Sequence, residues 1–460
     1  MQNGTSVFEH LESQVRTYCR QWPAVFSSAC GSRIRDEHGT EYIDFFAGAG
    51  SLNYGHNHPR LKQALLRYLQ DDAIVQSLDM HTTAKRDFLQ TFHQRILVPR
   101  GLDMRIQFSG PSGTTAVEAA IRLARKYTGR KPILSFENAF HGMSLGALAL
   151  SPHTAGEMAQ LCPYTLVARY DDESATVADS LASAESLLSR PDTELPAACI
   201  LEIVQGEGGQ YAARDSWLTG LSELCRSRGV LLIVDDVQMG CGRTGSFFSF
   251  EQSGITPDIV CLSKSISGYG LPMALTLLRP ELDIWKPGEH TGTFRGNNPS
   301  FTTATAALDF WQDPAFLDRI SEAGMTLEQG CRSLAADCSD VISGVRGRGM
   351  VWGLVCREAD LARSVCERAF ANRLLVERSG CNNDVVKLMP PINISEADMA
   401  LGLDALRDSL KEVTQRVRGC LSRSTDVVQQ LNDRIPDVLL WHTRGREFVH
   451  IPVTWAGHAK

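Results

Sequence analysis

The chain has 460 residues, a formal net charge of −7 and charged residues of both signs mixed along its length. This length exceeds one ordinary hydrophobic core, so it predicts a large domain with a smaller companion and space for an enclosed site. The modest negative charge argues against binding to nucleic acid or to an anionic membrane. No apolar run approaches the roughly 20 residues of a membrane span, and residues 1–8 lack the pattern of a secretion signal, so we expect a cytoplasmic protein.

The thirteen cysteines include no C-x-x-C pair. Cys199 and Cys261 lie inside apolar, strand-like runs, where a reduced thiol behaves as a small hydrophobic side chain. We therefore expect free thiols in a reducing compartment and no metal site. Cys241 stands between two glycines and has two interpretations, a reactive thiol or a packed one, of which packing is favoured.

The N-terminal segment carries a short helix signal and then a hairpin signal. An amphipathic pattern over residues 7–16 predicts a helix, which Trp22-Pro23 ends. Strand-like runs at 32–35 and 42–45 flank a D-E-H-G turn and predict a hairpin. The glycine-rich stretch 46–59 follows, and its small residues allow either a close approach to a ligand or a simple turn.

Helical periodicity returns at Pro59, and a strand, a turn and a second helix then follow over residues 105–129. The turn places Gly113 and Thr114 at a helix N-terminus, where free N–H groups and the helix dipole attract a phosphate. No Gly-Lys-Ser/Thr follows and the glycines lack dinucleotide spacing, so a single phosphate is predicted. The alternative is a plain helix cap, for which Ser and Thr are the commonest residues.

A further strand is predicted over residues 132–136, and Phe140 follows it in an aromatic-His-Gly turn. The Phe140 ring has two interpretations: it lies on a planar ligand, or it packs in the core. Residues 153–197 contain polar helices and proline breaks.

The middle of the chain repeats the pattern of strand, helix and strand. The apolar run 197–204 leads to Glu207, a helix covers 216–228, and the apolar run 230–234 ends on Asp235. Short connections between such elements predict an α/β fold with a mostly parallel sheet, whose ligands bind at the carboxyl ends of the strands. The candidate site residues that follow strands at that end are Gly113, Phe140, Glu207, Asp235 and Lys264.

Lys264 lies in the stretch 260–272, V-C-L-S-K-S-I-S-G-Y-G-L-P, directly after a short apolar run and directly before a Ser/Gly-rich turn. Burial favours a neutral amine, which is the form that attacks an aldehyde to give an imine. A surface lysine with a buried stem is the alternative. A lysine amine, a single-phosphate cradle, a buried carboxylate and a stacking aromatic together indicate a site for pyridoxal 5′-phosphate, with Asp235 facing the pyridine nitrogen.

The second half of the chain changes character. Helices are predicted from Phe301 to about Gln329, and a strand and turn over 341–355 open a smaller α+β region. The run 385–391 predicts a strand edge ended by prolines, and Ser395 caps a helix with Met399, Leu403, Leu406 and Leu410 on its apolar face. The tail beyond Ser424 contains two possible strands, 438–441 and 448–453, and no role is assigned to it.

Over about residues 7–420 the chain resembles the class III aminotransferases of fold type I. The family pattern is carried by residues 235–245, D-D-V-Q-M-G-C-G-R-T-G, and 257–264, P-D-I-V-C-L-S-K. Three further stretches, 44–56, 267–273 and 290–298, resemble the branch of the family that makes 2,4-diaminobutyrate, as found in ectoine biosynthesis.

This resemblance implies an α/β fold: a large domain built on a mostly parallel, seven-stranded type of sheet, plus a smaller α+β domain. The expected boundaries are a 1–58 N-terminal segment belonging to the small domain, a 59–300 cofactor-binding domain, a 301–423 C-terminal small domain and a 424–460 extra tail. The implied cofactor is pyridoxal 5′-phosphate, and the implied catalytic residues are Lys264 and Asp235.

The resemblance also assigns cofactor contacts to individual side chains. Gly113 and Thr114 match the phosphate-binding turn, and Phe140 matches the aromatic that stacks on the ring. Val237 packs on the opposite ring face, and Gln238 approaches the phenolic oxygen. Thr293 matches a threonine that binds the phosphate of the neighbouring subunit's cofactor, which implies a homodimer with shared active sites and leaves a higher oligomer open.

The chain departs from many relatives where the substrate carboxylate is bound. In those relatives the glutamate that matches Glu207 pairs with an arginine, and this arginine leaves the glutamate to bind the carboxylate of the substrate glutamate. The residue of this chain that matches the arginine is Lys387. An ammonium cannot reproduce a bidentate guanidinium clamp, so Arg295, Lys387 and Tyr54 are the candidate contributors to substrate binding. Met143 replaces an arginine of several relatives, and Asp236 replaces a glutamate with the same charge.

The implied reaction moves the amino group of L-glutamate to L-aspartate 4-semialdehyde, giving L-2,4-diaminobutyrate and 2-oxoglutarate by a ping-pong route. The alternatives are an aminotransferase for ornithine, 4-aminobutyrate or a polyamine, and an aminomutase of the same fold. The pathway stays open, because ectoine, siderophores and peptide natural products all use this diamine.

Overall fold

The computed structural model describes residues 5–152, 164–190 and 194–434, with side chains through residue 419. The chain divides into two compact units, residues 1–414 and 415–460. The first unit contains the sheets and helices described below, and the second begins within helix α14 (Glu396–Arg434). The two strands predicted at 438–441 and 448–453 lie outside the described residues.

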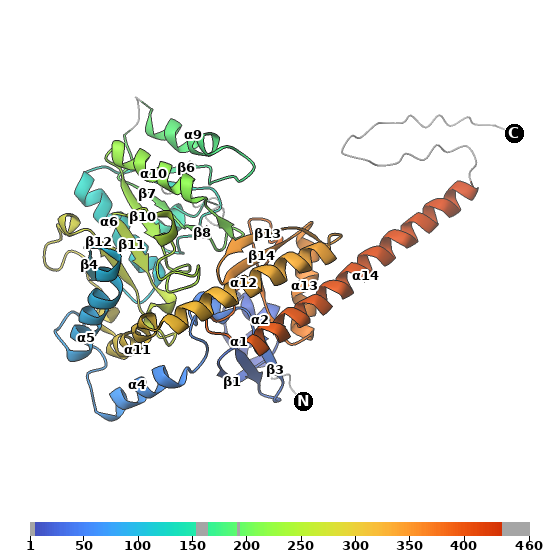
Figure 1. Cartoon of the computed structure of the whole chain (residues 1–460), viewed down its shortest axis with the longest axis horizontal. Helices are drawn as coiled ribbons and strands as arrows, with labels where there is room; N and C mark the ends of the chain where they lie inside the picture. Colours follow the sequence, from blue (N-terminus) through green and yellow to red (C-terminus); the bar gives the residue numbers. More distant parts are fainter. Residues whose placement is uncertain (1–4, 153–163, 191–193, 435–460) are drawn as a thin grey trace. The chain divides into compact units, whose positions relative to one another are not determined.

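The largest sheet among the described residues has seven strands and lies on one side of the first unit (Figure 1). Its strands, in spatial order, are β4 (Arg105–Phe108), β12 (Leu275–Leu278), β11 (Ile259–Leu262), β10 (Leu231–Asp235), β7 (Ala198–Leu201), β5 (Ile133–Phe136) and β6 (Thr165–Ala168). Strand β12 runs antiparallel to both neighbours, and the strands from β11 to β6 are parallel to one another. The predicted mostly parallel sheet is therefore confirmed.

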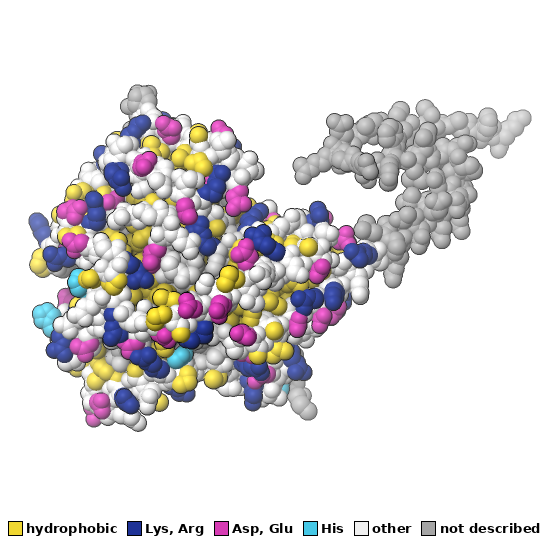
Figure 2. Space-filling model, viewed as in Figure 1, with side chains coloured by type: hydrophobic (Ala, Val, Ile, Leu, Met, Phe, Trp, Pro, Cys, Tyr) yellow, Lys and Arg dark blue, Asp and Glu magenta, His cyan; other side chains and the backbone are white. Residues whose placement is uncertain are grey.

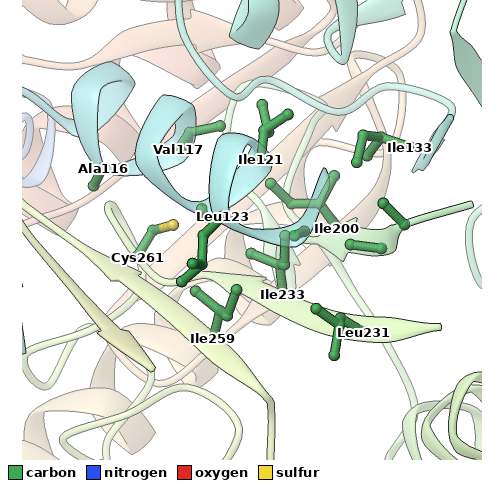
Figure 3. Packing of buried hydrophobic residues seen from close by; sticks show 14 of the residues in the cluster. Ala116, Val117, Ile121, Leu123, Ile133, Ile200, Leu231, Ile233, Ile259 and Cys261 are labelled. Carbon is green, nitrogen blue, oxygen red and sulfur yellow. The ribbon is translucent and has the colours of Figure 1, made fainter. Parts of the chain in front are cut away.

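The five interior strands of this sheet are buried along their whole length and are mostly apolar, because helices cover them. Helix α6 (Gly113–Thr128) buries Ala116, Val117, Ala120, Ile121, Leu123 and Ala124, at a spacing that forms one face. That face packs on Ile200, Ile233 and Ile259 of three neighbouring strands (Figure 3). Burial of this surface fixes the position of the helix and therefore of the turn at its N-terminus.

Further helices and short strands make up the rest of residues 59–337. The helix predicted from Pro59 and that predicted at 216–228 are both present, as α4 and α10. The elements are α4 (Pro59–Gln70), α5 (Thr83–Phe92), α7 (Leu145–Ala149), α9 (Val177–Leu188), β8 (Val204–Gln205), β9 (Tyr211–Ala212), α10 (Asp215–Ser227), α11 (Asn298–Leu308) and α12 (Pro314–Asp337). Short 3-10 or π segments link several of them, including one at Lys264–Ser267 and one at Thr293–Gly296.

Three N-terminal strands form a small sheet with β15 of the C-terminal half, in the order β1-β2-β3-β15. The predicted hairpin is confirmed, because β2 (Arg33–Asp36) and β3 (Glu41–Asp44) pair in antiparallel fashion. The helix predicted over 7–16 is shorter than expected: α1 ends at Leu11 and buries no side chain. The other elements are β1 (Phe26–Cys30), α1 (Ser6–Leu11), α2 (Tyr18–Gln21), α3 (Ala47–Gly50) and β15 (Leu374–Leu375).

A four-stranded sheet follows in the C-terminal half, in the order β13-β14-β17-β16. Its strands are β13 (Ile342–Arg348), β14 (Val351–Cys356), β17 (Val385–Leu388) and β16 (Glu377–Ser379), and α13 (Ala359–Ala371) follows β14 along the chain. The edge position predicted for the 385–391 run is wrong, because β17 pairs with both β14 and β16. The prolines that suggested an edge come after the last paired residue and block no hydrogen bond.

Helix α14 begins as predicted, because the Ser395 hydroxyl accepts a hydrogen bond of 3.1 Å from the Asp398 backbone N–H. Met399, Leu403, Leu406 and Leu410 are all buried along its first turns. The helix continues to Arg434, past the start expected for the tail. No helix in the described part of the chain has the length and apolar character needed to cross a bilayer.

The composition predicts both the mixture of charged side chains on the surface and the state of the cysteines. Figure 2 shows Lys and Arg side chains interspersed with Asp and Glu over the visible face. Every cysteine whose side chain the structure describes is a free thiol. Cys241 is buried, and burial raises the pKa of its thiol far above the ordinary value, so it lacks the thiolate character of a reactive cysteine.

Arg243 ties the segment after β10 to the C-terminal half. Its guanidinium is fully buried and donates to the backbone oxygens of Met350 and Pro390 and to Asn53 Oδ1, at 2.8, 2.5 and 2.6 Å. Burial lowers its pKa to about 9, against the opposing charge of Asp44.

We expect Arg243→Met to lower the free energy of unfolding by about 3 kcal/mol or more, because three buried acceptors lose their donor. Urea unfolding followed by circular dichroism measures this change. The exposed Arg332→Met is the control, and it should change the free energy of unfolding by about 0.5 kcal/mol or less. Equal losses in the two variants would contradict the structural role of Arg243.

Candidate active site

A cavity of about 170 Å³ lies at the carboxyl ends of the strands of the large sheet. Strands β4, β5, β7, β8, β10 and β11 each contribute a residue or a following turn to its wall. The lining residues are Ser112, Gly113, Thr114, Phe140, His141, Gly142, Glu202, Glu207, Asp235, Val237, Gln238 and Lys264. The structure therefore places eight of the predicted site residues around one cavity, and the remaining four lie elsewhere.

One wall is the N-terminus of α6. Ser112 occupies the N-cap position and its side chain makes no capping hydrogen bond. A Cβ atom at Gly113 would lie 2.6 Å from Val237 Cγ1, so only glycine fits between the helix start and Val237. A Cβ at Gly142 would lie 2.0 Å from Thr114 Oγ1. The backbone is thus held close to the cavity, in the arrangement that binds a phosphate.

Lys264 begins the short helical segment that follows β11 and has a φ of 51°. This left-handed conformation is rarely adopted by a residue with a side chain, and it directs the chain sharply away from the strand. Burial lowers the pKa of the Lys264 amine, although the charge of Glu207 raises it. The lysine is therefore suited to supply a neutral amine at the cavity wall.

Asp235, His141 and Glu202 are three buried ionisable residues that line the cavity and interact through their charges. His141 Nδ1 donates to Asp235 Oδ2 over 2.7 Å, and both side chains are buried. Burial lowers the pKa of His141, but the hydrogen bond and charge of Asp235, together with Glu202, raise it overall. Burial raises the pKa of Glu202 to about 7, against the opposing charge of His141.

Glu207, which also lines the cavity, pairs with Lys387. Lys387 Nζ lies 2.7 Å from Glu207 Oε1 and 2.8 Å from Glu377 Oε1. Gln238 Nε2 donates to the backbone oxygen of Ala49 at 3.1 Å and to Glu207 Oε1 at 3.4 Å. Burial lowers the pKa of the Lys387 ammonium, but the two carboxylates raise it overall, so the lysine is charged.

Four predicted residues do not line the cavity. Lys387 is fully buried behind Glu207. Tyr54 is 2% exposed, and its hydroxyl accepts a hydrogen bond of 2.9 Å from Trp311 Nε1. Arg295 donates to the His290 backbone oxygen and pairs with Asp79 beside a different cavity. Thr293 lies exposed at the start of its 3-10 segment. Tyr54 and Arg295 are thus not among the side chains that line this cavity, and their roles in substrate binding stay predictions.

Four lining residues were not predicted: Ser112, His141, Gly142 and Glu202. Glu202 has a sequence signal, since it is a single carboxylate inside the apolar run 197–204 and buried carboxylates require partners. His141 stands beside Phe140 in the turn already noted, but nothing in the sequence indicates which of the two faces the cavity floor.

The residues present fit pyridoxal 5′-phosphate. The Gly113 turn offers backbone N–H groups for one phosphate, and Asp235 offers a buried carboxylate for a protonated ring nitrogen. Phe140 and Val237 are apolar side chains in the cavity wall, as contact with the faces of a planar ring requires. Lys264 supplies the amine.

The lowered pKa of Lys264 predicts its reactivity towards an acylating reagent in the cofactor-free protein. Acetic anhydride reacts with neutral amines, so the labelling of Lys264 should reach half its maximum at a lower pH than the ordinary lysine value of about 10.4. Mass spectrometry of peptides labelled across a pH series measures this midpoint, with exposed Lys62 as the reference. A midpoint for Lys264 at or above that of Lys62 would contradict the prediction.

Comparison with known proteins shows which family the chain resembles. Residues 17–410 match the family model described as aminotransferase class-III. The chain is 53% identical over 413 residues to the diaminobutyrate--2-oxoglutarate transaminase of Streptomyces anulatus, covering 88% of this chain and 98% of the relative. It is 49% identical over 418 residues to the enzyme of the same name from Halalkalibacterium halodurans, covering 90% and 98%.

Solved structures share the fold. The ornithine aminotransferase of Toxoplasma gondii ME49 superposes with a TM-score of 0.78 at 26% identity and covers 89% of this chain and 95% of its own. A transaminase from the marine bacterium Virgibacillus superposes with a TM-score of 0.80 at 18% identity, covering 90% and 99%. The second likeness concerns the fold alone.

Proposed function

The chain belongs to the class-III aminotransferases, and on this basis we propose that it transfers the amino group of L-glutamate to L-aspartate 4-semialdehyde. The products are L-2,4-diaminobutyrate and 2-oxoglutarate, and the reaction is reversible. The observation that carries this proposal is the convergence of Lys264, Asp235 and the Gly113 turn on one cavity, in a chain about half identical to diaminobutyrate--2-oxoglutarate transaminases.

The enzyme depends on pyridoxal 5′-phosphate, which when bound supplies an aldehyde carbon and a ring that accepts electrons. Lys264 carries a proton on Nζ to and from the substrate carbon, because its lowered pKa lets it act as base and then as acid. The negative Asp235 carboxylate would balance the positive charge of the protonated ring nitrogen. The hydrogen bond from His141 orients this carboxylate. The Gly113 and Thr114 N–H groups hold the phosphate.

Glu207 and Lys387 select the substrates at the far end of the cavity. The Glu207 carboxylate, which is partly exposed, meets the second ammonium of the diamine. A carboxylate of L-glutamate is attracted to the Lys387 ammonium when Glu207 moves aside. One site thus receives both substrates in turn, as a ping-pong reaction requires.

Two copies of the chain form a homodimer in this proposal, and Thr293 reaches the phosphate site of the neighbouring subunit. The exposure of Thr293 and Phe294 supports this arrangement. Exposed apolar side chains on α4 and in the segment between α4 and α5 offer the contact surface: Leu66, Leu69, Ile74, Val75, Leu78 and Met80. The dimer acts in the cytoplasm, where it supplies the diamine to a pathway such as ectoine synthesis.

Single-turnover spectra test the reaction. The holoenzyme mixed with L-glutamate alone should release one equivalent of 2-oxoglutarate per site, and the resulting form should then react with L-aspartate 4-semialdehyde. In the reverse direction, L-2,4-diaminobutyrate should react faster than L-ornithine or 4-aminobutyrate. A preference for ornithine, or no release of 2-oxoglutarate, would overturn the proposal.

A further inference from the structure

Lys387 is shared by two carboxylates. Its Nζ lies 2.7 Å from Glu207 and 2.8 Å from Glu377, while its side chain is 0% exposed. An ammonium has three donors, so it can hold both carboxylates at once. A single pair would already balance its charge, which leaves the second carboxylate to be explained.

The two carboxylates differ in how firmly they are held. Glu377 stands directly opposite Lys387 in the antiparallel pairing of β16 and β17, and its side chain is only 4% exposed. Cross-strand neighbours of this kind remain within contact distance as long as the sheet is intact. The sheet therefore makes Glu377 a permanent partner of Lys387.

Glu207 lies where a substrate carboxylate can replace it as the partner of Lys387. It lies between Gly206 and Gly208 in the turn that joins β8 and β9, its side chain is 34% exposed, and it lines the cavity. Its other side-chain hydrogen bond, from Gln238, is long at 3.4 Å. Movement of Glu207 would open a direct path from the cavity to Lys387 without disturbing the β16–β17 pairing.

The charge balance explains the need for a second carboxylate. When a substrate carboxylate takes the place of Glu207, the number of charges around Lys387 is unchanged. If Glu377 were absent, the departure of Glu207 would leave a buried ammonium without any partner, which costs several kcal/mol. The Lys387 ammonium would then move with Glu207 or lose its proton. In either case no cation would remain at a fixed position to bind the substrate carboxylate.

We propose that Glu377 is a positioning residue that holds the Lys387 ammonium in place while a carboxylate of L-glutamate replaces Glu207. The pairing of β16 with β17 holds the Lys387 backbone, and the ion pair with Glu377 holds its ammonium. Together they give the lysine a defined position, which a guanidinium obtains from its planar fork. The diamine, which leaves Glu207 on Lys387, does not need Glu377. This inference rests on the proposed function, because it assigns the carboxylate site of the first substrate.

The test separates the two substrates. In Glu377→Leu the KM for L-glutamate should rise about tenfold or more, because the fixed partner of a charged donor is lost, while the KM for L-2,4-diaminobutyrate changes less than about threefold. Glu377→Gln keeps an acceptor oxygen for Lys387 and should recover part of the loss. Calorimetric titration of each holoenzyme with glutarate, an unreactive dicarboxylate, should show the same order of affinities.

The control is Asp171→Asn, which removes an equally buried carboxylate from its pair with Arg214 outside the cavity. It should lower the thermal midpoint without separating the two KM values. Equal changes for both substrates, or unchanged glutarate affinity in Glu377→Leu, would overturn the inference. If the leucine variant does not fold, the comparison of Glu377→Gln with wild type must still show selective loss for glutarate. A wild-type enzyme that reacts with neither amine would refute the proposed function instead.

Discussion

We expect Lys264→Ala to lower kcat for amino-group transfer by at least about 1,000-fold while the protein keeps its fold, because the amine acts both as nucleophile and as proton carrier. Alanine retains the Cβ atom, so the left-handed conformation at residue 264, with its φ of 51°, is no more strained than in wild type. The buried amine contributes little to stability, since burial disfavours its charged form. Stopped-flow spectra with L-glutamate and thermal unfolding measure the two parts of this result.

A small amine added to the medium distinguishes a chemical role from a structural one. In Lys264→Ala the space left by the side chain opens onto the cavity, so methylamine or ammonia should restore part of the proton transfer. The exposed Lys131→Ala is the matched control and should keep wild-type activity. Retention of both the visible absorbance of the cofactor-bound lysine and the activity in Lys264→Ala would refute the assignment of the site.

The sequence predicts the main sheet and the residues that follow its strands for a physical reason. A strand buried on both faces must be apolar throughout, so the run 230–234 marks a central strand, and Asp235 marks its carboxyl end. Because parallel strands end at one edge, Gly113, Asp235 and Lys264 were expected to meet, and they line one cavity.

Other features depend on partners that are distant in the sequence. Tyr54 accepts a hydrogen bond from Trp311, Arg295 pairs with Asp79, and neither residue lines the cavity. The interior position of β17 follows from its pairing with β16 and β14, which no local pattern reveals. Strand β6 was not predicted, because it lies at the end of the sheet and its Val167 is exposed, so its pattern is only partly apolar.

The roles of the individual site residues stay predictions, and Asp235 is the second one to test. We expect Asp235→Asn to lower kcat by about 100- to 1,000-fold, because an amide cannot balance a buried positive charge on the ring nitrogen and a broken buried pair costs about 3–5 kcal/mol. The hydrogen bond to His141 is changed as well, and the pKa of His141 should fall when the charge of Asp235 is removed. Single-turnover rates and an NMR titration of the imidazole measure these effects.

The neighbouring carboxyl supplies the control. Asp236 is buried and accepts a hydrogen bond of 3.1 Å from the Ser249 backbone N–H, but it does not line the cavity. Burial raises its pKa to about 7, so at neutral pH much of it is already protonated and uncharged. Asparagine resembles a protonated aspartic acid, so Asp236→Asn should change kcat by less than about threefold. If the two substitutions lower kcat equally, the loss in Asp235→Asn reflects general damage to the strand end rather than the loss of a charge partner for the cofactor.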